Sequence, residues 1–188
     1  WYYLTDRLTD EALKYIAINK ENPFFLYMSH YAVHDPIQGR KDLVKKYSEK
    51  LKDKDKNNNP AYILEGNPDN PNNPSRKELD SLINTPDYEA YKILPKGTVK
   101  VKQKQDNVEF AAMVESMDES LGRIIAKLKE LGIQDNTIIF FYSDNGGMSA
   151  INFGNSKRIV PKAQQDIAYS TSNLPLRGAK GWLYEGGI

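Results

Sequence analysis

Cysteine is absent from the 188 residues of the chain, which excludes disulfide bonds, thiolate metal sites and a cysteine nucleophile within it. An excess of either charge is also lacking, because 26 lysines and arginines nearly balance 25 aspartates and glutamates and leave a net charge of +1. No broad field is therefore present to attract nucleic acid or an anionic membrane. No run approaches the ~18 apolar residues of a transmembrane helix, so neither nucleic acid nor a membrane is expected as a partner.

The apolar residues that are present follow an order of strand, helix and strand. Residues 24–29 and 137–143 are short, largely apolar and aromatic runs, which are typical of buried strands. Between them, residues 108–131 carry one broad apolar stripe at helical spacing. This order predicts the α/β class, with a central, largely parallel sheet flanked by helices.

Polar residues indicate where the helices begin. Asp106 and Glu109 have the spacing of a capping box, with one acceptor and one reciprocal carboxylate before the long helix. Thr9 or Asp10 is expected to cap a shorter helix over residues 11–19.

Residues 41–106 differ in composition from the rest of the chain. They are rich in lysine, asparagine and proline and have few apolar anchors, which is typical of loops and short surface helices. We therefore expect an insertion that packs peripherally and contains little sheet between residues 50 and 100. Lys100, Lys102 and Lys104 alternate as on the solvated face of an edge strand, and contact with a polyanion is the alternative.

Polar residues that are able to bind a ligand follow both apolar runs. His34 and Asp35 come after the first run, and Asp144 and Asn145 directly follow the second. In open α/β sheets the ligand crevice lies beyond the carboxyl ends of the strands, which predicts a site there. Asp144 and Asn145 offer oxygen donors that suit a hard cation such as Ca²⁺ or Mg²⁺, although a calcium site needs ~6–8 oxygens. Alternatively, Asn145 and Gly146 form a tight turn.

Two histidines and one lysine are further candidates. His30, at the end of the first run, is expected to be packed and hydrogen-bonded. His34, on the loop before Pro36, is placed to act as a proton donor or an anion contact. Lys180 lies between small residues of the glycine-rich segment 176–188, where its ammonium is able to reach an oxyanion. The alternative for this segment is a solvated surface loop.

Taken in order, three motifs resemble the formylglycine-dependent sulfatases of the alkaline phosphatase superfamily. They are His34-Asp35-Pro36, Asp144-Asn145-Gly146, and Leu176-Arg177-Gly178-Ala179-Lys180-Gly181 followed by Glu185-Gly186-Gly187. The resemblance implies that Asp144 and Asn145 are ligands of Ca²⁺ rather than Mg²⁺. It also implies that His34 contacts the sulfate and protonates the departing alcohol, and that Lys180 binds a sulfate oxygen.

The nucleophile of the family has no counterpart in this chain. In the family, formylglycine is made from cysteine or serine in a pattern like Cys-x-Pro-x-Arg, upstream of the position of His34. The stretch Asn72-Asn73-Pro74-Ser75-Arg76 copies the spacing, but an asparagine cannot be oxidised to the aldehyde. We therefore expect residues 1–188 to be an internal part of a single sulfatase catalytic domain, with a polar insertion at about 41–106. The isolated chain is expected to be inactive.

The resemblance also implies a substrate class and a location. Sulfate esters of glycans or of aryl alcohols are the expected substrates, and a periplasmic or secreted protein is expected. Two other functions stay open at this point. One is a phosphoesterase or phosphonate monoester hydrolase of the same superfamily, and the other is a non-catalytic binding domain with this fold.

Overall fold

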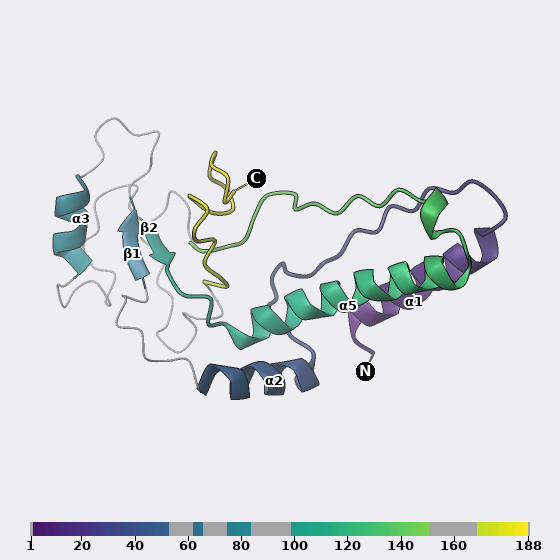
Figure 1. Cartoon of the computed structure of the whole chain (residues 1–188). Helices are drawn as coiled ribbons and strands as arrows, with labels where there is room; N and C mark the ends of the chain where they lie inside the picture. The colour runs from purple at the N-terminus through teal and green to yellow at the C-terminus, as the bar shows by residue number, and fades with distance from the viewer. Residues whose placement is uncertain (1, 53–61, 66–74, 84–98, 151–168, 188) are drawn as a thin grey trace. The chain divides into compact units, whose positions relative to one another are not determined.

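The computed structural model describes residues 2–52, 62–65, 75–83, 99–150 and 169–187 (Figure 1). These residues form two compact units, which are described separately. The first unit contains α1 (Leu4–Asn19), α2 (Lys41–Lys52), α5 (Val108–Glu130) and the 3-10 helix η1 (Gln134–Asn136). The second contains β1 (Tyr62–Glu65), α3 (Arg76–Ile83), β2 (Val99–Lys102) and the described segments 143–150 and 169–187. No helix in the described ranges is long and apolar enough to span a membrane.

Helix α5 is the centre of the first unit, because both α1 and α2 pack against it. Two short polar side chains meet where α1 contacts α5. Thr9 and Ser120 are both buried, and Thr9 Oγ1 lies 2.6 Å from Ser120 Oγ. A buried hydroxyl needs a hydrogen-bond partner, and this pair provides one while its small size lets the helices approach closely.

Helix α1 begins at Leu4, earlier than the predicted start at Thr9 or Asp10. Thr9 does not cap the helix, because its hydroxyl donates to the carbonyl oxygen of Thr5 at 2.7 Å within the helix. Threonine makes this backward bond inside helices as readily as it caps them. The burial of Thr9 against α5 therefore decides between the two roles.

Helix α5 matches the predicted range of 108–131 closely, but it begins in a different way. The carboxylate of Glu109 accepts a hydrogen bond from Gly39 N at 2.6 Å, and Asp106 pairs with a lysine of β2. The two carboxylates of the predicted capping box therefore have other partners, one of them distant in sequence and the other, Lys102, four residues before Asp106. The helix ends at Glu130, and Gly132 follows it with a φ of +71°, the left-handed conformation that glycine adopts after helix C-termini.

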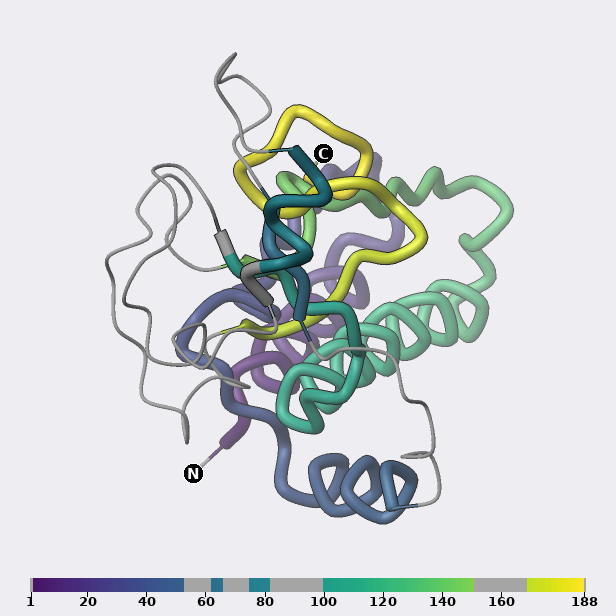
Figure 2. Tube along the Cα trace, turned by 90° about the vertical axis from the view of Figure 1, so that its left-hand side faces the viewer, coloured from purple at the N-terminus to yellow at the C-terminus, as the bar shows by residue number. Residues whose placement is uncertain are grey.

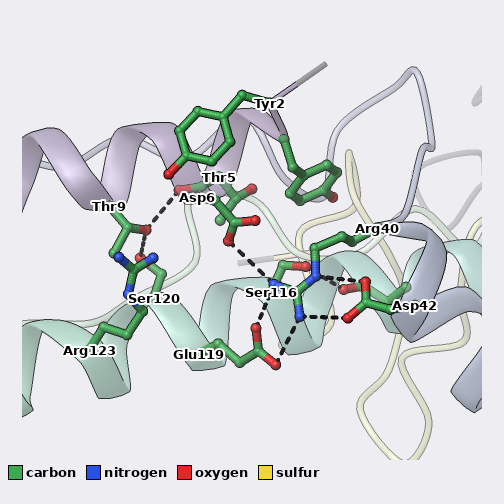
Figure 3. A network of polar contacts seen from close by, with 12 residues as sticks. Tyr2, Thr5, Asp6, Thr9, Arg40, Asp42, Ser116, Glu119, Ser120 and Arg123 are labelled. Atoms are coloured by element: carbon green, nitrogen blue, oxygen red, sulfur yellow. Dashed lines mark hydrogen bonds and ion pairs between the residues drawn. The ribbon is translucent and has the colours of Figure 1, made fainter.

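Arg40 connects all three helices of the first unit (Figure 3). Its guanidinium lies 2.7 Å from Glu119 Oε2 in α5 and 3.3 Å from Asp6 Oδ1 in α1. Asp42, in the first turn of α2, accepts two further bonds from Arg40 at 2.8 and 3.1 Å. Hydrogen bonds to Asp42 and Glu119 raise the pKa of Arg40 above its ordinary value. Charge-assisted contacts of this kind are about twice as strong as neutral hydrogen bonds.

The two apolar runs are extended, but the described residues hold no sheet in which they pair. Figure 1 shows both segments leaving the same end of the α1–α5 pair and running back in the same direction. Their outward side chains are largely exposed, with 82% of Phe25 and 82% of Phe140 accessible to solvent. This corrects the expectation that residues 24–29 and 137–143 are hydrogen-bonded strands of one central parallel sheet.

The first run nevertheless has the side-chain pattern of a strand. Phe24, Leu26 and Met28 are half-buried, whereas Phe25 and Tyr27 between them are exposed. Successive side chains of an extended segment point to opposite sides, so one row faces the protein and the other faces outward. Ladder hydrogen bonds need a neighbouring strand, and the described part of this unit does not supply one.

The sheet of the described residues lies in the second unit, within the segment that was expected to contain little sheet. Strands β1 and β2 pair antiparallel, with Tyr62 opposite Lys102 and Leu64 opposite Lys100. Helix α3 packs against β1 and begins with a capping box, in which Glu78 accepts hydrogen bonds from both N and Oγ of Ser75 at 2.7 Å. Among the described residues between 50 and 100, only Tyr62–Glu65 and the first two residues of β2 are in strands, so the expectation of little sheet there is not contradicted.

The lysines of β2 are buried, although their alternation indicated a solvated face. Lys100 is 4% exposed and Lys102 is 2% exposed. The cause is a second neighbour on the far side of β2, where Lys102 N donates to Ser149 O at 2.8 Å. The ammonium groups contact Tyr62 and Asp106: Lys100 Nζ lies 5.0 Å from the ring centre of Tyr62, and Lys102 Nζ lies 2.7 Å from Asp106 Oδ1.

Candidate active site

The predicted metal-binding pair lies in a turn of the second unit. Gly146 N donates to Ser143 Oγ at 3.0 Å, and Gly146 has a φ of +75°. The chain then continues to Ala150, which forms a bridge with Val101 of β2. The turn therefore leads into the β-structure of this unit and does not join two strands of a hairpin.

The segment with Lys180 consists of loops that close on themselves (Figure 2). Gly186 N donates to Arg177 O at 2.8 Å, and Trp182 N donates to Ala179 O at 2.9 Å. Trp182 is buried against Val101 in the small core of this unit. This tryptophan anchors the segment to the core, whereas Leu176 and Leu183 of the same segment are exposed.

The two loops are joined to each other through their backbones. Lys180 N donates a hydrogen bond to Gly147 O at 3.0 Å. A Cβ atom on Gly146 would lie only 2.1 Å from Gly186 O, so glycine is required where the loops touch. The structure thus brings Lys180 beside the turn that contains Asp144 and Asn145.

The side chains of this site are accessible to a ligand. Asp144 is exposed, and Asn145 and Lys180 are half-buried. Among the residues that the structure describes, no ion pair involves Asp144 or Lys180, which leaves one carboxylate and one ammonium for a bound group. Because their loops are joined through the backbone, the two groups are suited to bind a cation and an anion in neighbouring positions.

The donors fit part of a calcium site. A carboxylate and an amide oxygen are ligands that Ca²⁺ prefers, but they are two of the ~6–8 oxygens that the ion takes. No group of three or more histidine, cysteine, aspartate or glutamate side chains with metal-binding geometry occurs within the described ranges. Asp144 and Asn145 therefore fit the role of partial ligands, with the remaining oxygens supplied by other groups.

The two histidines lie in the first unit. His34 is exposed on a loop, where its backbone N donates to Tyr31 O at 2.8 Å and its Nδ1 lies 3.1 Å from Asp35 O. Its predicted convergence with Asp144, Asn145 and Lys180, which lie in the second unit, stays a prediction.

His30 differs from the sequence expectation. Within the described part of the chain its buried Nδ1 has no hydrogen-bond partner, although a hydrogen-bonded imidazole was expected. Burial without compensation disfavours the charged form and lowers the pKa of His30 below its ordinary value.

In a comparison with known protein families, residues 1–187 match the family model described as Sulfatase. The chain belongs to the sulfatase family. A sulfatase of Formosa agariphila is 29% identical over 99% of this chain. An arylsulfatase of Klebsiella aerogenes is 29% identical over 73% of it, and a multifunctional alkaline phosphatase superfamily protein of Trinickia caryophylli is 28% identical over the same share. The chain spans 23%, 28% and 26% of the length of these relatives, respectively.

Membership of the sulfatase family implies the α/β fold of the alkaline phosphatase superfamily. The resemblance that the ordered motifs indicated is thereby confirmed at the level of family. The described residues of this sulfatase chain contribute helices, two extended segments and a small antiparallel sheet to that fold.

Sequence reasoning missed one residue of the site, Asn173. Its side-chain amide lies between the two loops, with Nδ2 2.8 Å from Gly147 O and 3.0 Å from Gly186 O. The available signal was its place at the entrance to the glycine-rich segment, two residues before Pro175. Asparagine near glycine and proline usually stabilises a local turn. The position of Asn173 therefore does not indicate a contact with Gly147, which lies 26 residues earlier in the sequence.

Proposed function

We propose that this chain is part of the catalytic domain of a sulfuric ester hydrolase. The substrates are sulfate esters of glycans or of aryl alcohols, and the formylglycine nucleophile is supplied by a segment outside residues 1–188. The observation that carries the proposal is the hydrogen bond from Lys180 N to Gly147 O. This bond supports the proposal because it joins the loop of the proposed sulfate-binding lysine to the turn of the proposed metal ligands, in a chain of the sulfatase family.

The roles of the residues follow from the charges in the reaction. Cleavage of a sulfate ester moves negative charge onto the oxygen of the departing alcohol. The ammonium of Lys180 stabilises that charge, and a proton from His34 neutralises it, which lowers the barrier in both cases. Asp144 and Asn145 hold Ca²⁺, which when bound neutralises the sulfate and orients it toward the nucleophile.

A phosphoesterase or phosphonate monoester hydrolase is the second candidate. The observation in its favour is the 28% identity to the multifunctional alkaline phosphatase superfamily protein. The same charges would stabilise a departing alcohol on phosphorus, so these residues do not separate the two reactions. For either reaction we place the protein in the periplasm or outside the cell, in line with sulfatases that act on glycans.

The test compares substrates that differ only in the transferred group. The full-length protein is assayed with p-nitrophenyl sulfate, p-nitrophenyl phosphate and a phenyl phosphonate monoester, and we expect the highest kcat/KM for the sulfate. The 188-residue chain alone should not release p-nitrophenol above background. Preference for the phosphate or the phosphonate by the full-length protein would replace the first proposal with the second.

A variant tests the metal ligands. Asp144→Ala should lose activity in the full-length protein and regain part of it when Ca²⁺ is added in excess, because one of several oxygen ligands is removed. Asp135→Ala, which changes an exposed aspartate of η1, is the matched control. Equal effects of the two substitutions, or restoration by Zn²⁺ but not by Ca²⁺, would contradict the assignment.

A further inference from the structure

The side chain of Asn173 contacts three turns of the second unit at once. Its Nδ2 lies 2.8 Å from Gly147 O, 3.0 Å from Gly186 O and 3.4 Å from Gly178 O. The amide carries two hydrogens, so the two shorter contacts use its full donor capacity. One half-buried side chain therefore binds the turn with the proposed metal ligands to the loops on both sides of Lys180.

Gly147 is the point at which these contacts meet. Its carbonyl oxygen accepts from Asn173 Nδ2 and also from Lys180 N, at 2.8 and 3.0 Å. A Cβ atom on Gly147 would lie 2.6 Å from Asn173 Oδ1, so the backbone and the amide are in direct contact. A carbonyl held by two donors has its peptide plane fixed, and the proposed metal ligands lie only two and three residues before it.

We propose that Asn173 is a positioning residue for the sulfate-ester site, which sets the spacing between the Asp144–Asn145 turn and Lys180. This inference rests on the proposed function, and it adds a residue that touches neither the substrate nor the metal. Residues that orient metal ligands typically change metal affinity or activity by about 10–100-fold when they are replaced.

Gln105, which binds the residue next to Asn173, provides a matched control. The amide of Gln105 donates to Ser172 O at 2.7 Å, so it also connects this segment to the body of the second unit. Within the described residues, Gln105 makes no hydrogen bond to the turns around Lys180. Replacing Gln105 therefore tests whether anchoring the segment is enough, whereas replacing Asn173 tests the spacing of the site.

The experiment uses the full-length protein with Asn173→Ala, Asn173→Ser and Gln105→Ala. We measure hydrogen exchange of the peptides that contain residues 144–147 and 180, the Kd for Ca²⁺ by calorimetry, and kcat and KM with p-nitrophenyl sulfate. Circular dichroism checks the fold. If Asn173→Ala does not fold, Asn173→Ser, which keeps one hydroxyl donor, carries the comparison.

We expect Asn173→Ala to accelerate exchange in both peptides, to raise the Kd for Ca²⁺ by about 10–100-fold and to lower kcat by a similar factor with little change in KM. Gln105→Ala should leave all three at the wild-type values. Unchanged exchange in the Asn173 variants, or equal effects of the Gln105 variant, would overturn the positioning role. The wild-type protein could also lack both sulfatase turnover and Ca²⁺ binding while the Asn173 variants still exchange faster. That result would refute the proposed function, but it would still support the role of Asn173 in positioning the loops.

Discussion

At the scale of the single residue, Lys180 is the group whose removal should affect chemistry most directly. Its ammonium would contact an oxygen whose negative charge grows as the ester bond breaks, so the contact is stronger in the transition state than in the ground state. Lys180→Ala in the full-length protein should therefore lower kcat by about 10²–10³-fold and change KM much less.

Lys129→Ala is the matched control for this substitution, because Lys129 is exposed in the last turn of α5. Steady-state kinetics with p-nitrophenyl sulfate measure both variants. A rise in KM at constant kcat would mean that Lys180 binds substrate and transition state equally, which would contradict the proposed role.

Two glycines of the first unit make opposite predictions for stability. A Cβ on Gly39 would lie 2.6 Å from Ala112 Cβ and 2.9 Å from Glu109 O, whereas a Cβ on Gly122 in α5 would meet nothing within 4 Å. Gly39→Ala should lower the free energy of unfolding by about 1–3 kcal/mol through overpacking. Gly122→Ala should raise it by about 0.5–1 kcal/mol, because alanine is the better helix former. Urea denaturation measures both changes, and a stabilised Gly39→Ala variant would show that this segment does not pack against α5.

At the scale of elements, the contacts of Arg40 predict how firmly the three helices are held together. Its side chain is 25% exposed and faces carboxylates from α1, α2 and α5. Arg40→Ala leaves these carboxylates close together without a cation and should cost about 1–3 kcal/mol of unfolding free energy. Arg40→Lys keeps the charge but loses the fork geometry, so an intermediate loss is expected.

Lys52→Ala provides the comparison for Arg40. Lys52 pairs with Glu49 on the exposed face of α2, and such surface pairs contribute only about 0–1 kcal/mol. Denaturation in urea at low and at 0.5 M salt distinguishes the two sites. Equal losses for Arg40→Ala and Lys52→Ala would show that the Arg40 contacts are no stronger than a surface ion pair.

The elements also show what a sequence pattern is able to predict. The helix over residues 108–131 was predicted almost to the residue, because its apolar stripe and Gly132 are local signals. The strands were not, because a strand is defined by its neighbour. Residues 24–29 have the side-chain alternation without a pairing partner in the described part, and Lys100 and Lys102 are buried by a second neighbour that no local pattern indicates.

The same distinction holds for the site. Asp144, Asn145 and Lys180 could be proposed from the sequence because their motifs are short and their chemistry is explicit. Their roles stay predictions, and the structure joins their loops through Gly147. Asn173 was missed because its contacts reach Gly147, 26 residues away. Such contacts depend on the folded backbone rather than on neighbouring residues.

At the scale of the whole molecule, stability should depend on pH through the buried imidazole of His30. His30 is half-buried, and burial lowers its pKa below the ordinary value of 6.5. Between its lowered pKa and 6.5 the unfolded chain binds a proton at this position that the folded protein does not bind. The stability that comes from neutral His30 is therefore complete above pH 6.5 and is lost as the pH falls through the folded pKa.

This linkage predicts a difference between two otherwise similar variants. The melting temperature of the wild-type protein should fall as the pH is lowered from 7.5 to 5, with contributions from every group that titrates in this range. His30→Gln removes the contribution of the buried imidazole and should make the fall shallower. His34→Gln is the control, because His34 is exposed on a loop and is the only other histidine of the chain. Parallel pH profiles for wild type and His30→Gln would mean that the imidazole of His30 is as accessible to protons in the folded protein as in the unfolded chain.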